Sequence, residues 1–283
     1  MITLADWEKG GTFRTLHGHR IFCRDGGAAT APVLVLIHGF PTSSWDFEAL
    51  WAPLTERYRV ITLDMLGFGF SAKPDLAYSI GAQADLFEQR LEELGITGYH
   101  VLAHDYGDTV AQEFLAREAK LESVCFLNGG LFPETHRALF IQKLLLSPLG
   151  RFVARLTSRA RFEANMRSIF GKSTPPSREF IDGFWGLLQR DDGLRAMARI
   201  IHYMPERAAK RERWVGAIER TTVPLKLIDG ASDPVSGGHM VARYRELVPK
   251  PDVTVLETIG HYPHVEAPRP VLEAYLHFRS SLP

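Results

Sequence analysis

The sequence predicts an α/β fold with a mostly parallel central sheet, helices on both faces and one inserted helical segment. From Val33 onward, short β-branched runs alternate with amphipathic segments, and this alternation is typical of a parallel sheet covered by helices. Between residues 133 and 222 the alternation stops, because that interval shows helical patterning and no strand-like run. We therefore expect a helical cap inserted between two strands of a continuous sheet.

Six short apolar runs predict the parallel strands. They are VLVLI (33–37), VITL (60–63), HVLA (100–103), SVCFLN (123–128), PLKLI (224–228) and VTVLE (253–257). Each runs into a turn rich in Gly, Asp, Pro or Asn, and such carboxyl-end turns are where open α/β sheets hold ligands. Helices are expected at about 44–56, 80–95, 106–119, 238–247 and 268–280. The segment TFRTLHGHRIFC, which precedes the first unit, predicts an antiparallel hairpin at the sheet edge.

These patterns divide the chain into two predicted domains. Residues 1–132 and 223–283 would form the α/β core, and residues 133–222 would form the helical cap, or lid. The cap contains a basic run, RFVARLTSRAR. We interpret this run as a solvated helix face and not as a nucleic-acid site.

Composition and charge favour a small-molecule partner. The 283 residues carry a formal net charge of +0, so no overall field attracts nucleic acid or an anionic membrane. Cys23 and Cys125 lie in apolar runs, which predicts buried thiols in a reducing compartment. The amino-terminal segment lacks an apolar signal region, and no apolar stretch is long enough to span a bilayer. We expect a cytoplasmic protein with no membrane partner.

The segment around Asp105 predicts a nucleophile elbow. The strand HVLA leads into His104-Asp105-Tyr106-Gly107, and a helix-like segment follows. Small residues two positions before and after the centre, Ala103 and Gly107, meet the steric demand of a sharp strand–helix turn. The central residue would then be Asp105. The alternative is that Asp105 is an ordinary helix N-cap, a position that aspartate favours.

Two further residues complete a nucleophile–acid–histidine set. Asp233 follows one strand in the turn GASDPV, and His261 follows the next in TIGHYPH. All three candidates come just after strand ends, so they would meet at one edge of the sheet. Asp233 could instead serve turn formation before a proline. His264 is the rival of His261, and Asn128 stands at another strand end, although an amide cannot stabilise an imidazolium by charge.

The turn His38-Gly39-Phe40-Pro41 predicts half of an oxyanion hole. In an elbow of this kind, one backbone donor comes from that loop and the other from the residue after the nucleophile, which points to Phe40 and Tyr106. Pro41 has no N–H, and a cis bond before it would aim the Phe40 amide at the site. We expect the substrate pocket to be lined by His38, Pro41, Trp45, His104, Trp185, His202 and His264.

With these motifs in place, the chain resembles the epoxide hydrolase and haloalkane dehalogenase branch of the α/β-hydrolase superfamily. The motifs HGFP, LDMLGFGFSAKP, HDYGD, GASDPV and GHYP occur in order along nearly the whole chain. Within the superfamily, HGFPTSSWDF, HDYGDTVAQE, NGGLFPETHR and RWVGAI resemble the mesoderm-specific transcript group. The resemblance implies an α/β-hydrolase fold, with Asp105 as nucleophile, Asp233 as acid and His261 as the base that activates water.

The resemblance also implies a ring-opening proton donor in the cap. Tyr203 matches one of the cap tyrosines of epoxide hydrolases by its place before the RERW segment. No tyrosine occurs between Leu131 and Phe184, so the second tyrosine of that family is missing or is replaced by His202. An aromatic that packs the cap onto the sheet is the alternative role for Tyr203.

An aspartate nucleophile narrows the chemistry. Carboxylates are ionised near neutrality and need no base for activation. Attack on a carboxylic ester would give a mixed anhydride, whereas attack on the saturated carbon of an epoxide or alkyl halide gives an ordinary ester. We therefore expect an epoxide hydrolase that uses its epoxide substrate and water, with no cofactor or metal. The alternatives are a haloalkane or haloacid dehalogenase, in which Trp185 would bind halide, and a binding protein without turnover.

Overall fold

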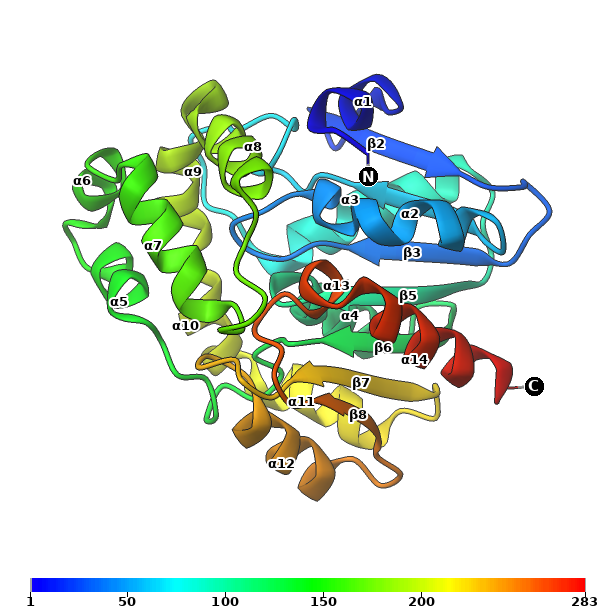
Figure 1. The fold of residues 1–283 in the computed structure, drawn as a ribbon. Helices are drawn as coiled ribbons and strands as arrows, with labels where there is room; N and C mark the ends of the chain where they lie inside the picture. Colours follow the sequence, from blue (N-terminus) through cyan, green and yellow to red (C-terminus); the bar gives the residue numbers. More distant parts are fainter. Residues whose placement is uncertain (1, 283) are drawn as a thin grey trace.

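A computed structural model describes residues 2–282 and contains one eight-stranded sheet in the order β1-β2-β4-β3-β5-β6-β7-β8 (Figure 1). The strands are β1 (Thr12–Leu16), β2 (His19–Gly26), β3 (Val33–Ile37), β4 (Arg59–Leu63), β5 (Tyr99–His104), β6 (Leu121–Leu127), β7 (Leu225–Gly230) and β8 (Asp252–Leu256). The pairs β1–β2 and β2–β4 are antiparallel, and the remaining pairs are parallel. The predicted α/β fold, the edge hairpin and the six parallel strands are confirmed.

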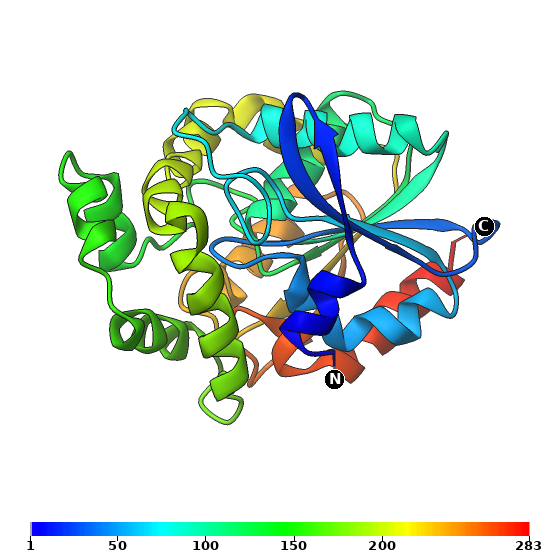
Figure 2. The same ribbon diagram turned by 90° about the horizontal axis from the view of Figure 1, so that it is seen from above.

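Helices cover both faces of this sheet, as the view from above shows (Figure 2). The core helices are α1 (Leu4–Lys9), η1 (Ser44–Phe47), α2 (Glu48–Thr55), α3 (Ile80–Glu93), α4 (Tyr106–Ala116), α11 (Arg211–Arg220), α12 (Gly238–Leu247), α13 (Pro263–Glu266) and α14 (Pro268–Ser280). Helices α2 and α14 pack together on one face, while α3, α4 and α11 pack on the other. Because β5 is buried along its full length, it forms the centre of the core, as expected for a parallel strand covered on both faces.

The segment between β6 and β7 forms a helical layer over the carboxyl ends of the strands (Figure 1). Its helices are α5 (Phe140–Leu146), α6 (Gly150–Arg155), α7 (Arg159–Ile169), α8 (Arg178–Gln189), η2 (Arg190–Asp192), α9 (Gly193–Ile200) and α10 (Tyr203–Ala209). The next helix, α11, packs against α4 in the core. The division into a core and a lid at residues 133 and 222 stays a prediction.

Neither cysteine forms a disulfide, and both Cys23 and Cys125 are buried in strands. The core is therefore held together by packing and hydrogen bonds.

A membrane-crossing helix, long and apolar enough for a bilayer, is not found among residues 2–282.

Gly107 allows α4 to start directly against β3. A methyl group at this position would collide with the backbone carbonyl oxygens of Ile37 and His38, which cannot move without displacing the strand end. We expect Gly107→Ala to lower the free energy of unfolding by about 1–3 kcal/mol, measured by urea denaturation. Gly186→Ala is the matched control, since within residues 2–282 its added methyl would meet no heavy atom within 4 Å beyond its chain neighbours and the backbone of its own helix. In the interior of α8 this control should stabilise the protein by about 0.5–1 kcal/mol. Equal effects of the two substitutions would contradict the proposed close packing.

Candidate active site

Asp105 occupies the turn between β5 and α4 in a conformation that aspartate rarely adopts. Its φ is 47° and its ψ is −103°, a region that costs free energy for any residue other than glycine. Its side chain makes no hydrogen bond that caps α4. Instead, Oδ2 of Asp105 accepts a hydrogen bond of 3.1 Å from the backbone N–H of Phe40. The structure thus favours the elbow interpretation over a simple helix cap.

One of the two predicted donors of the oxyanion hole contacts this carboxylate, and the other is the residue that follows Asp105 in the chain. Phe40 precedes a cis bond to Pro41, and its N–H points at Asp105. Tyr106 is the first residue of α4, so its N–H has no acceptor within the helix. The Phe40 N–H is therefore bound to the Asp105 carboxylate, and the Tyr106 N–H has no acceptor within α4.

Asp233 and His261 lie together as a hydrogen-bonded pair. Nδ1 of His261 is 2.7 Å from Oδ2 of Asp233, and both side chains are almost completely buried. Asp233 also accepts hydrogen bonds from the N–H groups of Val235 (2.8 Å) and Ser236 (3.1 Å). Because Nδ1 donates to the carboxylate, Nε2 of His261 is the nitrogen at which the ring gains or loses a proton.

Charge keeps this pair ionised in spite of its burial. Burial opposes a charge on His261, but the negative charge and hydrogen bond of Asp233, followed by the charge of Asp105, raise the pKa of His261 to about 9. Burial also opposes the charge of Asp233, yet His261 and the backbone donors hold the pKa of Asp233 below its ordinary value. At neutral pH the site therefore contains an imidazolium placed between two carboxylates.

Asn128 locks the acid in place. Its side-chain N–H donates to Oδ2 of Asp233 (3.2 Å) and to the carbonyl of Gly230 (3.1 Å), and its Oδ1 accepts from the Gly230 N–H (2.6 Å). These bonds join the carboxyl ends of β6 and β7. Because Asn128 donates to the Asp233 carboxylate, it positions Asp233 and does not replace it.

Asp108 lies buried in the first turn of α4. Burial, followed by the negative charge of Asp105, raises the pKa of Asp108 well above its ordinary value. Burial and the charge of Asp105 thus both favour the protonated form of Asp108.

Three histidines predicted in the substrate pocket instead lie behind the site, which corrects their assignment. His38 is held between the carbonyl of Gly39 (2.9 Å) and the N–H of Met65 (3.0 Å). Nε2 of His104 lies 2.8 Å from the carbonyl oxygen of His261, and it must donate there because a carbonyl only accepts. His264 stacks on the ring of Phe47 at 4.7 Å. These histidines support the loops that carry the reacting groups.

A mostly apolar cavity lies above Asp105 and His261, between the core and the cap. Its lining residues are Phe40, Pro41, Asp105, Leu139, Ile141, Gln142, Leu145, Thr157, Phe162, Asn165, Met166, Ile169, Met197, Val235 and His261. Pro41 is thus placed in the cavity, as predicted. Gln142, Thr157 and Asn165 were missed, because a polar residue in a helical pattern carries no sign of which way it faces.

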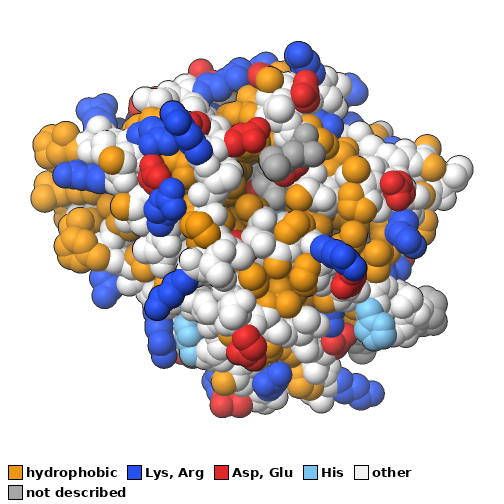
Figure 3. Space-filling model, viewed as in Figure 1, with side chains coloured by type: hydrophobic (Ala, Val, Ile, Leu, Met, Phe, Trp, Pro, Cys, Tyr) orange, Lys and Arg blue, Asp and Glu red, His pale blue; other side chains and the backbone are white. Residues whose placement is uncertain are grey.

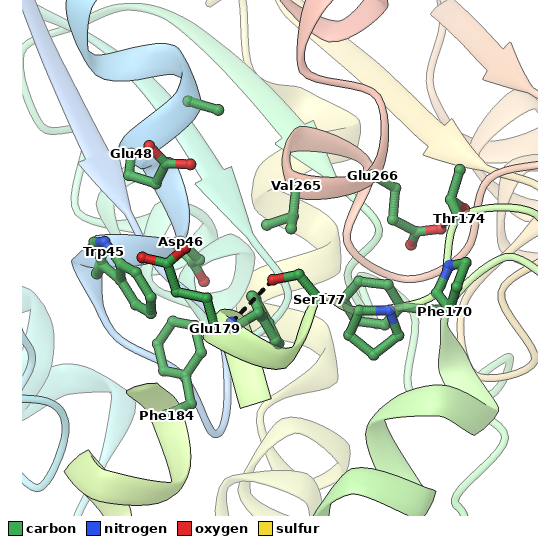
Figure 4. A pocket seen from close by; sticks show the side chains of 14 residues that line it. Trp45, Asp46, Glu48, Phe170, Thr174, Ser177, Glu179, Phe184, Val265 and Glu266 are labelled. Atoms are coloured by element: carbon green, nitrogen blue, oxygen red, sulfur yellow. Dashed lines mark hydrogen bonds between the residues drawn. The ribbon is translucent and has the colours of Figure 1, made fainter. Parts of the chain in front are cut away.

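The remaining predicted pocket residues lie elsewhere. Trp185 packs behind Phe162, with ring centroids 6.0 Å apart, and His202 is exposed beside a different hollow. Trp45 lines a second pocket together with Glu48, Phe184 and others (Figure 4). Neither Asp105 nor His261 borders that second pocket. Helical spacing in the sequence could not show whether Trp45, Trp185 and His202 face the cavity above Asp105 or another surface.

Tyr203 is buried beside the elbow, where aromatic contacts hold it. Its ring centroid lies 4.8 Å from that of Tyr106 and 6.1 Å from that of Phe40, and the guanidinium of Arg207 lies 4.7 Å from its ring centroid. Burial, followed by the charge of Asp105, raises the pKa of Tyr203 above its ordinary value. The phenol is therefore protonated at neutral pH and has a proton to donate. The buried Arg207 was not predicted from the sequence.

One group of possible metal ligands occurs within the described chain, and it lies beneath the site. Candidate ligand atoms of Asp46, His104 and His264 lie within 4.8 Å of one another, and all three residues are buried. The hydrogen bond from His104 to the His261 carbonyl uses one of the ring nitrogens. Nε2 of His104 is thus occupied in holding the loop of His261, and only the other ring nitrogen of His104 could bind a metal.

An elbow aspartate, an acid–histidine pair and a covering cap together define an α/β-hydrolase architecture. The chain belongs to the alpha/beta hydrolase family, whose model matches residues 34–274. It is 40% identical to the mesoderm-specific transcript homolog protein of Homo sapiens over 98% of this chain and 88% of the relative. It is 37% identical to the putative hydrolase LipZ of Mycobacterium tuberculosis, over 97% of each chain. The resemblance to the mesoderm-specific transcript group is confirmed.

Solved structures share the fold. An alpha/beta hydrolase fold protein from Burkholderia ambifaria superposes with a TM-score of 0.83 at 22% identity, covering 94% of this chain and 97% of the other. A haloalkane dehalogenase loop variant from Bradyrhizobium elkanii gives a TM-score of 0.81 at 19% identity, covering 96% and 97%. At these identities the likeness extends to the fold alone.

The charge of Asp105 is one cause of the raised pKa of His261. We expect Asp105→Asn to lower the pKa of His261 from about 9, because one of the two neighbouring negative charges is lost. NMR titration of the imidazole nitrogens measures this pKa directly. Asp108→Asn is the matched control and should leave the pKa of His261 unchanged, since the charges that raise this pKa are those of Asp233, Asp105 and Glu266. An unchanged His261 pKa in Asp105→Asn would show that the two groups do not interact.

Proposed function

We propose that this protein is an epoxide hydrolase that converts epoxides to vicinal diols through an ester on Asp105. The observation that carries the proposal is the Asp105 carboxylate, which stands at the elbow beneath an apolar cavity with a backbone N–H on one of its two oxygens. A carboxylate at this position suits attack on saturated carbon. The apolar lining suits a neutral substrate with a hydrocarbon body.

The first step opens the ring. Because the Phe40 N–H engages Oδ2 of Asp105, Oδ1 is the oxygen that attacks the epoxide carbon. The carbon–oxygen bond of the ring breaks as the new ester bond forms, and the departing oxygen takes the phenolic proton of Tyr203. Ring strain and this single donor drive the step in the absence of a second cap tyrosine.

The second step hydrolyses the ester. Forming the ester removes the negative charge of Asp105, so the pKa of His261 falls. The imidazolium then returns a proton to the Tyr203 phenolate, and the freed Nε2 of His261 becomes a base toward water. Hydroxide attacks Cγ of Asp105, and the charge that develops on Oδ2 is stabilised by the N–H groups of Phe40 and Tyr106. Collapse of this intermediate releases the diol, whose oxygen takes the proton that His261 had accepted from water. The proton left on the new Asp105 carboxyl group then passes to His261, which restores the carboxylate and the imidazolium.

The dehalogenase alternative lacks support in the cavity. A departing halide needs N–H donors, for which the indole of Trp185 was the candidate. Trp185 packs behind Phe162, and no tryptophan occurs among the cavity residues of the described chain. A binding protein without turnover would not need a hydrogen-bonded pair of Asp233 and His261 beside the Asp105 carboxylate. The arrangement therefore favours an enzyme.

Trapping the ester tests the proposal. His261→Gln removes the base for the second step but leaves the nucleophile, so incubation with a panel of small epoxides should add the mass of one epoxide to the intact protein. Mass spectrometry of the peptides should place the adduct on Asp105. The double variant Asp105→Asn/His261→Gln is the control and should gain nothing.

Three other results of the adduct experiment would contradict the epoxide hydrolase proposal. Adducts from haloalkanes but not from epoxides would replace the proposal with a dehalogenase. The absence of adducts across both panels would favour the binding-protein alternative, and an adduct that persists in the double variant would remove Asp105 from the mechanism.

A further inference from the structure

The cap carries the large apolar side chains that the described chain exposes most. They all lie in or beside α5 and α6, the helices farthest from the sheet, at the left of Figure 3. We name these four residues the cap patch: Phe140 (75% exposed), Leu149 (66%), Phe152 (62%) and Leu156 (54%). Exposing two phenylalanines and two leucines in or beside two short helices is unfavourable in water. A concentrated patch of this kind marks an interaction surface.

Basic residues are interspersed with the cap patch along the sequence. Residues 135–162 contain six basic residues and no acidic residue, and the six are Arg137, Lys143, Arg151, Arg155, Arg159 and Arg161. Arg151 contacts Asp75 at 3.6 Å, and Arg159 pairs with Glu163 and Asp182. Within residues 2–282, Lys143 and Arg155 form no ion pair. The net charge of zero for the whole chain conceals this local excess of positive charge.

The cap patch is continuous with the wall of the active-site cavity. Phe140 lies between Leu139 and Ile141, which both line the cavity. Leu156 likewise precedes Thr157, another lining residue. The same short segments therefore present apolar side chains to the outside on one face and to the cavity on the other.

We propose that the cap patch docks this protein onto anionic phospholipid bilayers. Phe140, Leu149, Phe152 and Leu156 would enter the headgroup region, and the basic residues would contact the lipid phosphates. Because no described helix could cross a membrane, the attachment would be peripheral. This proposal replaces the expectation of no membrane partner, which rested on the net charge of the whole chain and on the lack of an apolar stretch that could enter or cross a bilayer.

The composition of the surface favours lipid over a protein partner. Lysine and unpaired arginine beside exposed phenylalanine and leucine are typical of elements that lie in a membrane interface. Protein interfaces instead deplete lysine from their cores. Docking here would also place the cavity wall of α5 next to the bilayer, from which an apolar molecule could reach it.

Vesicle sedimentation of the full chain tests the proposal. The wild-type protein should sediment with vesicles that contain phosphatidylserine and bind vesicles of pure phosphatidylcholine more weakly, with added salt reducing the difference. Phe140→Ser/Phe152→Ser should lower the partition coefficient by about tenfold or more, since two apolar rings are lost. Circular dichroism and thermal unfolding check that the variant is folded.

Charge reversals supply the matched comparison. Arg155→Glu should weaken binding to the phosphatidylserine vesicles by about tenfold. Arg269→Glu changes the charge equally on α14, where the side chain is 88% exposed, and should leave binding unchanged. Sedimentation with neither vesicle, or undiminished binding of Phe140→Ser/Phe152→Ser, would overturn the proposal. A dimer seen by ultracentrifugation and abolished by the same two substitutions would assign the cap patch to a second copy of the chain.

Discussion

The left-handed backbone of Asp105 is the constraint on which the site depends. A φ of 47° turns the chain sharply between β5 and α4, and this turn keeps the carboxylate from capping its own helix. The strain is tolerated because the flanking backbone is packed on every side, with β5 buried along its length and Gly107 pressed against β3. The carboxylate is therefore directed toward the Phe40 N–H and the cavity above it.

Electrostatics then links the three reacting groups into one unit. His261 lies between Asp233, which orients it, and Asp105, whose charge changes during the proposed reaction. In the free protein both carboxylates favour the imidazolium, while an ester on Asp105 would remove one of them. The proposed cycle thus switches His261 from a charged partner to a base without any movement of the backbone, and Asn128 holds the acid fixed throughout.

The sequence was sufficient for the sheet and for the order of the reacting groups, because buried parallel strands appear as continuous apolar runs and their ends meet at one edge. The pocket was harder to predict, since periodicity identifies an element but not what each side chain faces. His38 and His104 therefore looked like pocket residues, although they bind backbone groups behind the site. Arg207 is buried against Tyr203 and Thr109, and an arginine in a basic helix carries no sign of such burial.

The most direct test of the central claim, that Asp105 is the nucleophile, follows the oxygen atoms through a single turnover. With enzyme in excess over an epoxide in H₂¹⁸O, a carboxylate nucleophile gives its own oxygen to the diol and takes one from water. The account predicts a first-turnover diol without heavy oxygen and a peptide whose Asp105 has gained it. Heavy oxygen in that first diol, with none in Asp105, would mean that water attacks the epoxide directly and would contradict the account.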